Sequence, residues 1–199
     1  MSFDVLYVCT GNVCRSPMAE LLMRGWMRPD VDATVGSAGV KALVGYGIDR
    51  SSASALGQLG IDPSKHRARQ FEYWMAENSH LILTATRNQR DIVMTAAPRT
   101  MRRTFTMKEF VRLSGPLPGA GPDDVVAAAA ARRGRVPSVT PEEDNVRDPY
   151  RGAIAQAKTI AEEITETVYS TLDVLGFAAE RWAHPTVART GRGERPAPY

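Results

Sequence analysis

The chain has few of the residues that form disulfide bonds or bind structural metal ions. Its 199 residues include two cysteines, five positions apart, and three histidines. Two cysteines so close in sequence cannot supply a disulfide framework. With only three histidines and no second cysteine pair, the sequence also argues against a structural zinc site. We therefore expect a fold held together by its hydrophobic core.

Long apolar runs are also missing. The longest, from Val125 to Ala131, is far too short to span a bilayer. The N-terminus enters a predicted strand almost at once and lacks a basic segment followed by a long apolar core, so we expect no signal peptide. We therefore expect a cytoplasmic protein with no membrane partner.

The charge balance is mild, at +3, although basic residues cluster at 66–69, 102–103 and 132–135. No aromatic interleaving or recognised nucleic-acid motif accompanies these clusters, so we expect solvated surface and no nucleic-acid partner. Attraction of acidic phosphopeptides is a secondary interpretation. The length and the 43% hydrophobic content suit one globular domain with a sizeable core.

The stretch from Val5 to Glu20 is the most informative part of the chain. Val5 to Val8 indicates a strand buried on both faces, and Met18 onward indicates a helix. Ser16 is a good helix cap, and Pro17 would suit the first helical position. A strand, a small-residue loop and a helix start place several backbone N–H groups and a helix dipole around one point, which favours anion binding.

A cysteine lies in this predicted anion site. We expect the pKa of Cys9 to lie well below the free value of ~8.5, because the amides, the dipole and Arg15 would stabilise its thiolate. The same groups could hold a tetrahedral oxyanion against the sulfur, which indicates attack on phosphorus. A lone cysteine is more often an inert buried residue, but the surrounding strand, loop and helix start favour the functional interpretation.

The segment Cys9-Thr-Gly-Asn-Val-Cys-Arg-Ser-Pro-Met-Ala-Glu20 resembles the phosphate loop of the low-molecular-weight protein tyrosine phosphatases. The resemblance covers most of residues 3–113 and 146–176 and is weak in between. It implies a doubly wound α/β domain, a cysteinyl-phosphate intermediate, and neither metal nor other cofactor. It also implies a phosphotyrosine-containing protein as substrate, with a tyrosine kinase as a candidate partner.

The alternation of strands and helices predicts an α/β fold: a single, doubly wound, parallel four-stranded sheet with helices on both faces. The resemblance implies the strand order 2-1-3-4. Right-handed crossovers would place the loops after the strands, including the Cys9 loop, along one edge. We expect strands at 3–8, 33–37, 80–84 and 103–107, and helices at 17–28, from 49 or 50 to 59, 71–77, 86–96 and 108–113. A long helix should follow Tyr150, with its buried stripe formed by Ile154, Ala157, Ile160, Ala161, Ile164, Val168 and Leu172.

We expect one phosphatase domain over residues 1–178, an insertion at 114–145 and a flexible basic tail at 179–199. The insertion is rich in proline and contains an alanine-rich helix, from Val125 to Arg133, that follows two aspartates. Two interpretations stay open. It is a surface embellishment, or it edges the active site and selects substrates.

The resemblance assigns the chemistry to particular residues. Cys9 would be the nucleophile, Arg15 would grip two phosphate oxygens bidentately, and Asp148 would be the general acid and base. Taken alone, Asp148 before a proline is a plain helix cap, and both roles are compatible. Ser16 would stabilise the leaving sulfur, and Tyr150 would form the aromatic wall. The predicted substrate-binding residues are Thr10, Gly11, Asn12, Val13, Cys14, Ser16 and Tyr150.

Other positions have a supporting role or depart from the family. Ser37 and His66 match positions that brace Asn12 and Ser16, although either would also serve as a surface residue. Cys14 would trap an oxidised Cys9 as a disulfide or simply pack in the loop. The departures put the substrate preference in doubt: Leu43 replaces a rim tryptophan, Thr86 replaces Asp, and Arg151 replaces a second aromatic.

Three alternatives to a tyrosine phosphatase stay open. Arsenate reductases of this fold typically carry Gln at the position of Pro17, and one type needs further cysteines downstream. Protein-arginine phosphatases tend to have Thr at the position of Val13, so we expect poor turnover of phosphoarginine. A phosphopeptide-binding module would have no need of a nucleophile.

Overall fold

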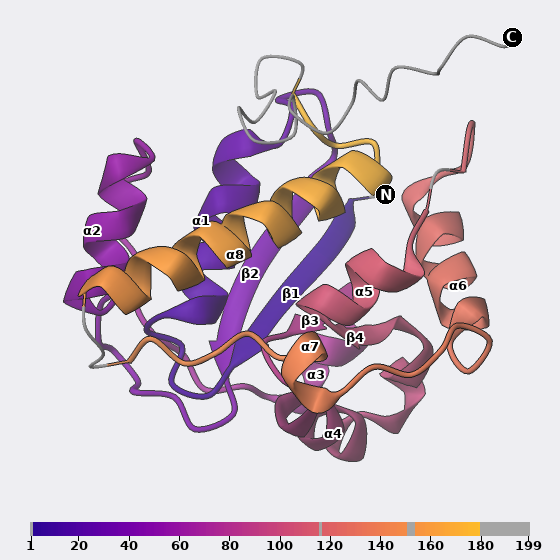
Figure 1. Cartoon of the computed structure of the whole chain (residues 1–199), viewed down its shortest axis with the longest axis horizontal. Helices are drawn as coiled ribbons and strands as arrows, with labels where there is room; N and C mark the ends of the chain where they lie inside the picture. The colour runs from indigo at the N-terminus through magenta and orange to yellow at the C-terminus, as the bar shows by residue number, and fades with distance from the viewer. Residues whose placement is uncertain (1, 116, 151–153, 180–199) are drawn as a thin grey trace, which may run out of the picture.

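The computed structural model describes residues 2–115, 117–150 and 154–179. At its centre lies a four-stranded parallel sheet, in the order β2-β1-β3-β4 (Figure 1). The strands are β1 (Phe3–Cys9), β2 (Ala33–Gly39), β3 (Leu81–Thr84) and β4 (Thr104–Thr106). The predicted α/β class and strand order are therefore confirmed.

The strands alternate their side chains between two layers of helices. Phe3, Val5 and Tyr7 belong to the larger buried cluster, whereas Leu6 and Val8 belong to a smaller one. The larger cluster includes residues of α1 (Arg15–Trp26), α2 (Arg50–Gln58), α5 (Met107–Leu113) and α8 (Ile154–Val174). The smaller cluster includes residues of α3 (Tyr73–Glu77) and α4 (Arg87–Ala96). In Figure 1, α8 crosses in front of β1 and β2.

The long helix α8 presents the predicted stripe to the core. Its members from Ala157 to Leu172 are all at least 96% buried. The side chain of Ile154 lies outside the described residues, as do Arg151 and residues 180–199 of the expected tail. Within the described part of the chain, none of the helices combines the length and the apolar character needed to cross a membrane.

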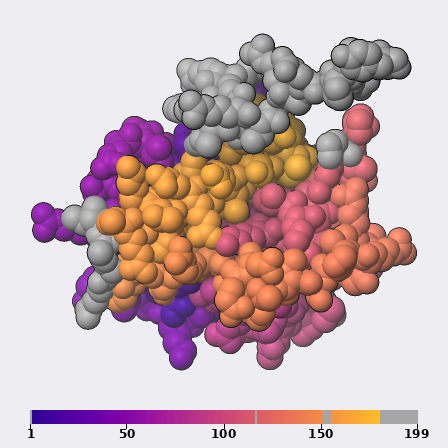
Figure 2. Space-filling model, in the orientation of Figure 1, coloured from indigo at the N-terminus to yellow at the C-terminus, as the bar shows by residue number. Residues whose placement is uncertain are grey.

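The segment predicted as an insertion contains two helices, α6 (Pro122–Arg132) and α7 (Pro141–Asp144). Helix α6 begins three residues earlier than expected, with Pro122 in its first turn. Helix α7 was missed; Thr140 and Glu143 form a capping box at its start. With α8, the segment forms much of the face seen in Figure 2.

The start of α1 corrects one prediction. The helix begins at Arg15 with Cys14 at its N-cap, so Ser16 is not the cap. The reason is that the Ser16 hydroxyl makes hydrogen bonds elsewhere in the loop. Pro17 is consequently the third helical residue, where the missing N–H still costs nothing because the first four amides of a helix have no intrahelical partner.

Other boundaries shift by a few residues. Helix α1 ends at Trp26, since Met27 makes an isolated antiparallel bridge with Ala178. Phe71 precedes α3 and packs in the smaller cluster. Pro98 opens a short 3₁₀ helix, η1 (Pro98–Arg103), that the sequence pattern did not predict.

Candidate active site

The loop between β1 and α1 curls around the sulfur of Cys9. The backbone N–H of Asn12 donates to Cys9 Sγ at 3.3 Å, and Ser16 Oγ lies 2.9 Å from the same sulfur. Cys9 is 2% exposed, so its sulfur sits at the floor of the loop. Both contacts suit a sulfur that carries negative charge, because N–H and O–H groups can donate to it.

Asn12 holds the loop in its unusual shape. It is the one non-glycine residue with positive φ (55°) in the described part of the chain. Its side-chain amide donates to Ser16 Oγ at 2.9 Å and to Ser37 Oγ at 2.8 Å, and its Oδ1 accepts from the N–H of Arg69 at 2.9 Å. These hydrogen bonds offset the strain of the left-handed backbone conformation at Asn12.

Ser37 and His66 both contact Asn12. Ser37 links it to helix α1, because the Ser37 hydroxyl donates to Glu20 Oε2 at 2.6 Å. His66 Nε2 lies 2.8 Å from the carbonyl oxygen of Asn12. Glu20 is the last residue of the segment that resembles the phosphate loop, but the sequence alone did not indicate a role for it.

Arg15 and Asp148 meet at the mouth of the loop although 133 positions separate them. Arg15 Nη2 donates to Asp148 Oδ2 at 2.6 Å, and Arg15 Nη1 donates to the carbonyl oxygen of Val146 at 3.1 Å. The Arg15 side chain is 5% exposed and that of Asp148 is 52% exposed. The carboxylate thus faces the opening, where a substrate would enter. Its other oxygen accepts from the N–H of Tyr150 at 3.1 Å, a local bond that also steadies the turn.

A cavity of about 160 Å³ lies above the sulfur. Its lining includes eight of the predicted site residues and two others: Cys9, Thr10, Gly11, Val13, Cys14, Arg15, Asp148, Tyr150, Lys41 and Leu43. Asn12 and Ser16 are fully buried and do not line the cavity, so their side chains support the loop from inside the protein. Lys41 was missed, although its place just after β2, at the carboxyl edge of the sheet, could have indicated it.

Gln89 is a second residue that the sequence analysis missed. It is 3% exposed, and its Nε2 donates to Thr10 Oγ1 at 2.9 Å. It also closes the capping box of α4 with Thr86, so the start of α4 is tied to the loop. Only the fold brings these residues together, because 79 positions separate Gln89 from Thr10.

Cys14 is buried in the same loop. Burial raises its pKa to about 12, outweighing a hydrogen bond with Ser52 that lowers it. Cys14 is therefore a neutral thiol at pH 7. Among the described residues, no group of three or more His, Cys, Asp or Glu side chains could hold a metal ion.

The arrangement suits capture of a tetrahedral oxyanion. The backbone amide of Asn12 and the hydroxyl of Ser16 contact the sulfur at the floor, and a buried guanidinium and an exposed carboxylate stand at the mouth. A sulfur so placed can attack the central atom of the anion, while the carboxylate can exchange a proton with a departing group.

Known proteins resemble this chain in sequence and in fold. A probable low molecular weight protein-tyrosine-phosphatase, EpsP of Ralstonia solanacearum, is 39% identical over 53% of this chain and 71% of its own. A protein-arginine-phosphatase of Geobacillus stearothermophilus is 35% identical over 65% of this chain and 87% of its own. The crystal structure of a low molecular weight protein tyrosine phosphatase from T. tengcongensis, 28% identical, superposes with a TM-score of 0.66 over 86% of this chain and 99% of its own.

The family model for low molecular weight phosphotyrosine protein phosphatases matches residues 4–117. That range contains all of the sheet except Phe3, together with the loop around Cys9. The chain belongs to this family.

Proposed function

We propose that this protein hydrolyses phosphotyrosine in proteins through a cysteinyl-phosphate on Cys9. One observation carries the proposal: Arg15 and Asp148 meet within 2.6 Å at the mouth of a cavity that has the Cys9 sulfur in its lining. An anion-binding floor with a proton donor at the rim is what cleavage of a phosphate ester requires.

In the first step the Cys9 thiolate attacks phosphorus in line with the phenolic oxygen. The S–P bond forms as the P–O bond to the phenol breaks, and protonated Asp148 gives its proton to the departing oxygen. Arg15 and the amides of residues 10–15 hold the three equatorial oxygens. The pairing of Asp148 with Arg15 supports this step, because a bound phosphate would compete for Arg15 Nη2 and release the carboxylate towards the ester.

In the second step water replaces the cysteine on phosphorus. Asp148, now ionised, takes a proton from the water as the O–P bond forms and the S–P bond breaks. The sulfur leaves as a thiolate, and Ser16 Oγ, 2.9 Å from it, can donate a hydrogen bond to the developing charge. Inorganic phosphate then leaves and the enzyme returns to its starting state.

Tyr150 and Leu43 support an aromatic substrate. Both line the cavity and are partly exposed, at 41% and 36%, so they can flank a flat ring. We infer that the partners are phosphotyrosine proteins, with a tyrosine kinase among them, and that the protein acts in the cytoplasm. We further propose a phosphatase domain over residues 1–178 and a separate tail from residue 179.

A second candidate is hydrolysis of phosphoarginine, because one relative is named a protein-arginine-phosphatase. Val13 argues against it. This residue lines the cavity with an aliphatic side chain, so position 13 offers no hydroxyl to bind a guanidinium. We expect Val13→Thr to raise turnover of phosphoarginine peptides relative to phosphotyrosine peptides, measured side by side with wild type.

The decisive assay follows hydrolysis of phosphotyrosine, phosphoserine and phosphoarginine peptides in the presence of a chelator. We expect wild type to prefer phosphotyrosine, Cys9→Ser and Arg15→Ala to be inactive, and Asp148→Asn to lose about 10²–10⁴-fold. Retained activity in Cys9→Ser would exclude the mechanism. Faster thiol-dependent reduction of arsenate would favour a reductase, and phosphopeptide binding without turnover would favour a binding module.

A further inference from the structure

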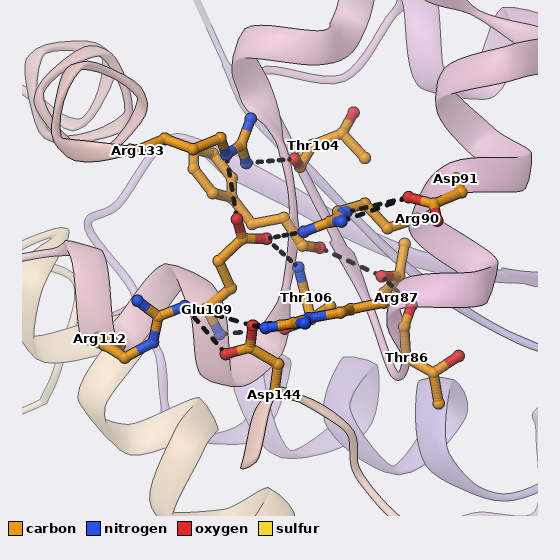
Figure 3. Close-up of polar contacts among 12 residues, drawn as sticks. Thr86, Arg87, Arg90, Asp91, Thr104, Thr106, Glu109, Arg112, Arg133 and Asp144 are labelled. Carbon is orange, nitrogen blue, oxygen red and sulfur yellow. Dashed lines mark hydrogen bonds and ion pairs between the residues drawn. The ribbon is translucent and has the colours of Figure 1, made fainter. Parts of the chain in front are cut away.

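Two buried carboxylates fasten the insertion to the rest of the domain, each between two arginines (Figure 3). Asp144 is 2% exposed and pairs with Arg87 and Arg112; we call these three residues the Asp144 cluster. Glu109 is 4% exposed and pairs with Arg90 and Arg133, which form the Glu109 cluster. Both clusters join helices α4 and α5 to segment 121–144, the first through Asp144 at its end and the second through Arg133 just after α6.

Only the Asp144 cluster leads into the active site. Arg87 donates through Nε to Asp144 Oδ2 at 2.9 Å, and its backbone N–H donates to Asn145 Oδ1 at 2.8 Å. The next residue, Val146, is fully buried and donates its N–H to the carbonyl oxygen of Ala85 at 2.8 Å. Residues 144–146 are therefore fixed beside the carboxyl end of β3.

The same short segment ends at the catalytic pair. The carbonyl oxygen of Val146 accepts from Arg15 Nη1 at 3.1 Å, and two residues later Asp148 accepts from Arg15 Nη2 at 2.6 Å. Asp148 is 52% exposed and stands at the rim. Its position therefore depends on the anchored residues before it, and the orientation of Arg15 depends on Val146.

We propose that the Asp144 cluster positions Asp148 and Arg15 for phosphoryl transfer, which makes Arg87, Arg112 and Asp144 positioning residues. The inference rests on the proposed function. It also assigns a role to the insertion, since α7 and Asp144 deliver the segment that carries the general acid. The Glu109 cluster makes no such bonds to residues 144–148: Arg133 donates to Glu109 and to the carbonyl oxygens of Met101 and Thr104, and Arg90 donates to Glu109 and Asp91.

The Glu109 cluster supplies a matched control. Asp144→Asn and Glu109→Gln each turn a buried carboxylate held by two arginines into its amide. In Glu109→Gln, the capping box of α5 survives, because Gln serves at that position as Glu does. A general loosening of the insertion would affect both variants alike, whereas a positioning role would affect only the first.

The test measures kcat/KM for aryl phosphates whose phenols range from good to poor leaving groups. Loss of proton donation matters most when the leaving group is poor. We expect Asp144→Asn to lose at least about tenfold more on phenyl phosphate than on 2,4-dinitrophenyl phosphate, and misplacement of Arg15 to add a loss that is equal for both substrates. Glu109→Gln should keep the wild-type dependence, and Asp148→Asn should show the steepest one. Arg87→Lys keeps the positive charge but loses the paired N–H donors of the guanidinium. Its kcat/KM should depend on the leaving group in the same direction as that of Asp144→Asn, but less steeply.

Amide hydrogen exchange tests the same inference without activity. We expect Asp144→Asn, and not Glu109→Gln, to speed exchange at Val146, whose N–H is bonded to Ala85. Unchanged exchange and a wild-type leaving-group dependence in Asp144→Asn would overturn the inference, and so would equal effects in the two variants. Activity that survives Cys9→Ser would instead overturn the proposed function.

Discussion

At the scale of single residues, the loop around Cys9 relies on side chains that never touch the substrate. Asn12 is the clearest case, because it combines a positive φ with three side-chain hydrogen bonds and no exposed surface. Alanine at this position would lose the three bonds and keep the strain. Glycine would lose the bonds and relieve the strain.

We therefore expect Asn12→Ala to lower the free energy of unfolding by about 2–4 kcal/mol and to lower kcat. Asn12→Gly should be the more stable of the two by about 1 kcal/mol, with a kcat that is still reduced. Urea denaturation of the two variants measures the difference. Equal stability would mean that the backbone of residue 12 is not strained.

The buried thiol of Cys14 should make the stability of the protein depend on pH. Burial raises its pKa in the folded protein to about 12, whereas the unfolded thiol titrates near ~8.5. Between these values the unfolded chain has released a proton that the folded chain still holds, so stability falls as pH rises. Tyr7 acts in the same direction, because burial raises its pKa too.

We expect Cys14→Ala to remove part of this alkaline loss. Between pH 8 and 10.5, wild type should lose about 2 kcal/mol more than the variant, measured by urea denaturation. Tyr7 is present in both proteins, so its contribution cancels in the comparison. Parallel pH profiles would contradict a buried, neutral Cys14.

Single residues also show what the sequence alone could not supply. The roles proposed for Cys9 and Arg15 could be inferred because the strand, loop and helix around them are contiguous. Ser16 was misplaced as a cap because its partners Ala38 and Asn12 become visible only in the folded loop. Gln89 could not be inferred at all, since its contact with Thr10 is purely tertiary.

At the scale of elements, the end of β2 supports the loop from below. Gly39 is the last residue of β2, and a Cβ built there would lie 2.5 Å from the carbonyl oxygen of Thr10 and 2.9 Å from the amide nitrogen of Asn12. Both are backbone atoms of the phosphate loop, so an added methyl group could be accommodated only if the loop moved.

We expect Gly39→Ala to lower the free energy of unfolding by about 1–3 kcal/mol and to reduce kcat/KM by about tenfold or more. Gly57→Ala is the matched control, because a Cβ there meets nothing within 4 Å. Aryl phosphate hydrolysis and urea denaturation of both variants provide the measurement. Wild-type activity in Gly39→Ala would show that the strand end does not set the loop's shape.

Helix α6 shows that the segment predicted as an insertion contributes to the core. Val125, Val126 and Ala129 are at least 94% buried and belong to the same cluster as β1 and α8. The alanine-rich pattern predicted the helix, but not its depth of burial. Periodicity marks an apolar face and does not name the surface against which it packs.

We expect Val125→Ala to cost about 1.5–3 kcal/mol of stability, as for a core residue. Ala127→Ser, on an exposed part of the same helix, should cost about 0.5 kcal/mol or less. Thermal denaturation of the two variants tests the point. Similar values would mean that α6 is only a surface helix.

At the scale of the whole molecule, the fold was the part most open to prediction. Buried apolar runs alternating with helical patterns suffice for a parallel α/β sheet, and the family resemblance supplied the strand order. The path by which segment 114–148 returns to the sheet was not predictable. It depends on Asp144 meeting Arg87 and Arg112, and no local pattern encodes ion pairs between such distant residues.

Both steps of the proposed reaction require that a phosphoryl group pass through the Cys9 sulfur. The most direct measurement is acid quenching of the enzyme during turnover of a phosphotyrosine peptide, followed by mass spectrometry of its peptides. We predict one added phosphoryl group on Cys9 in wild type, more of it in Asp148→Asn relative to free phosphate released, and none in Arg15→Ala. Phosphate release from wild type with Cys9 never modified would contradict the account.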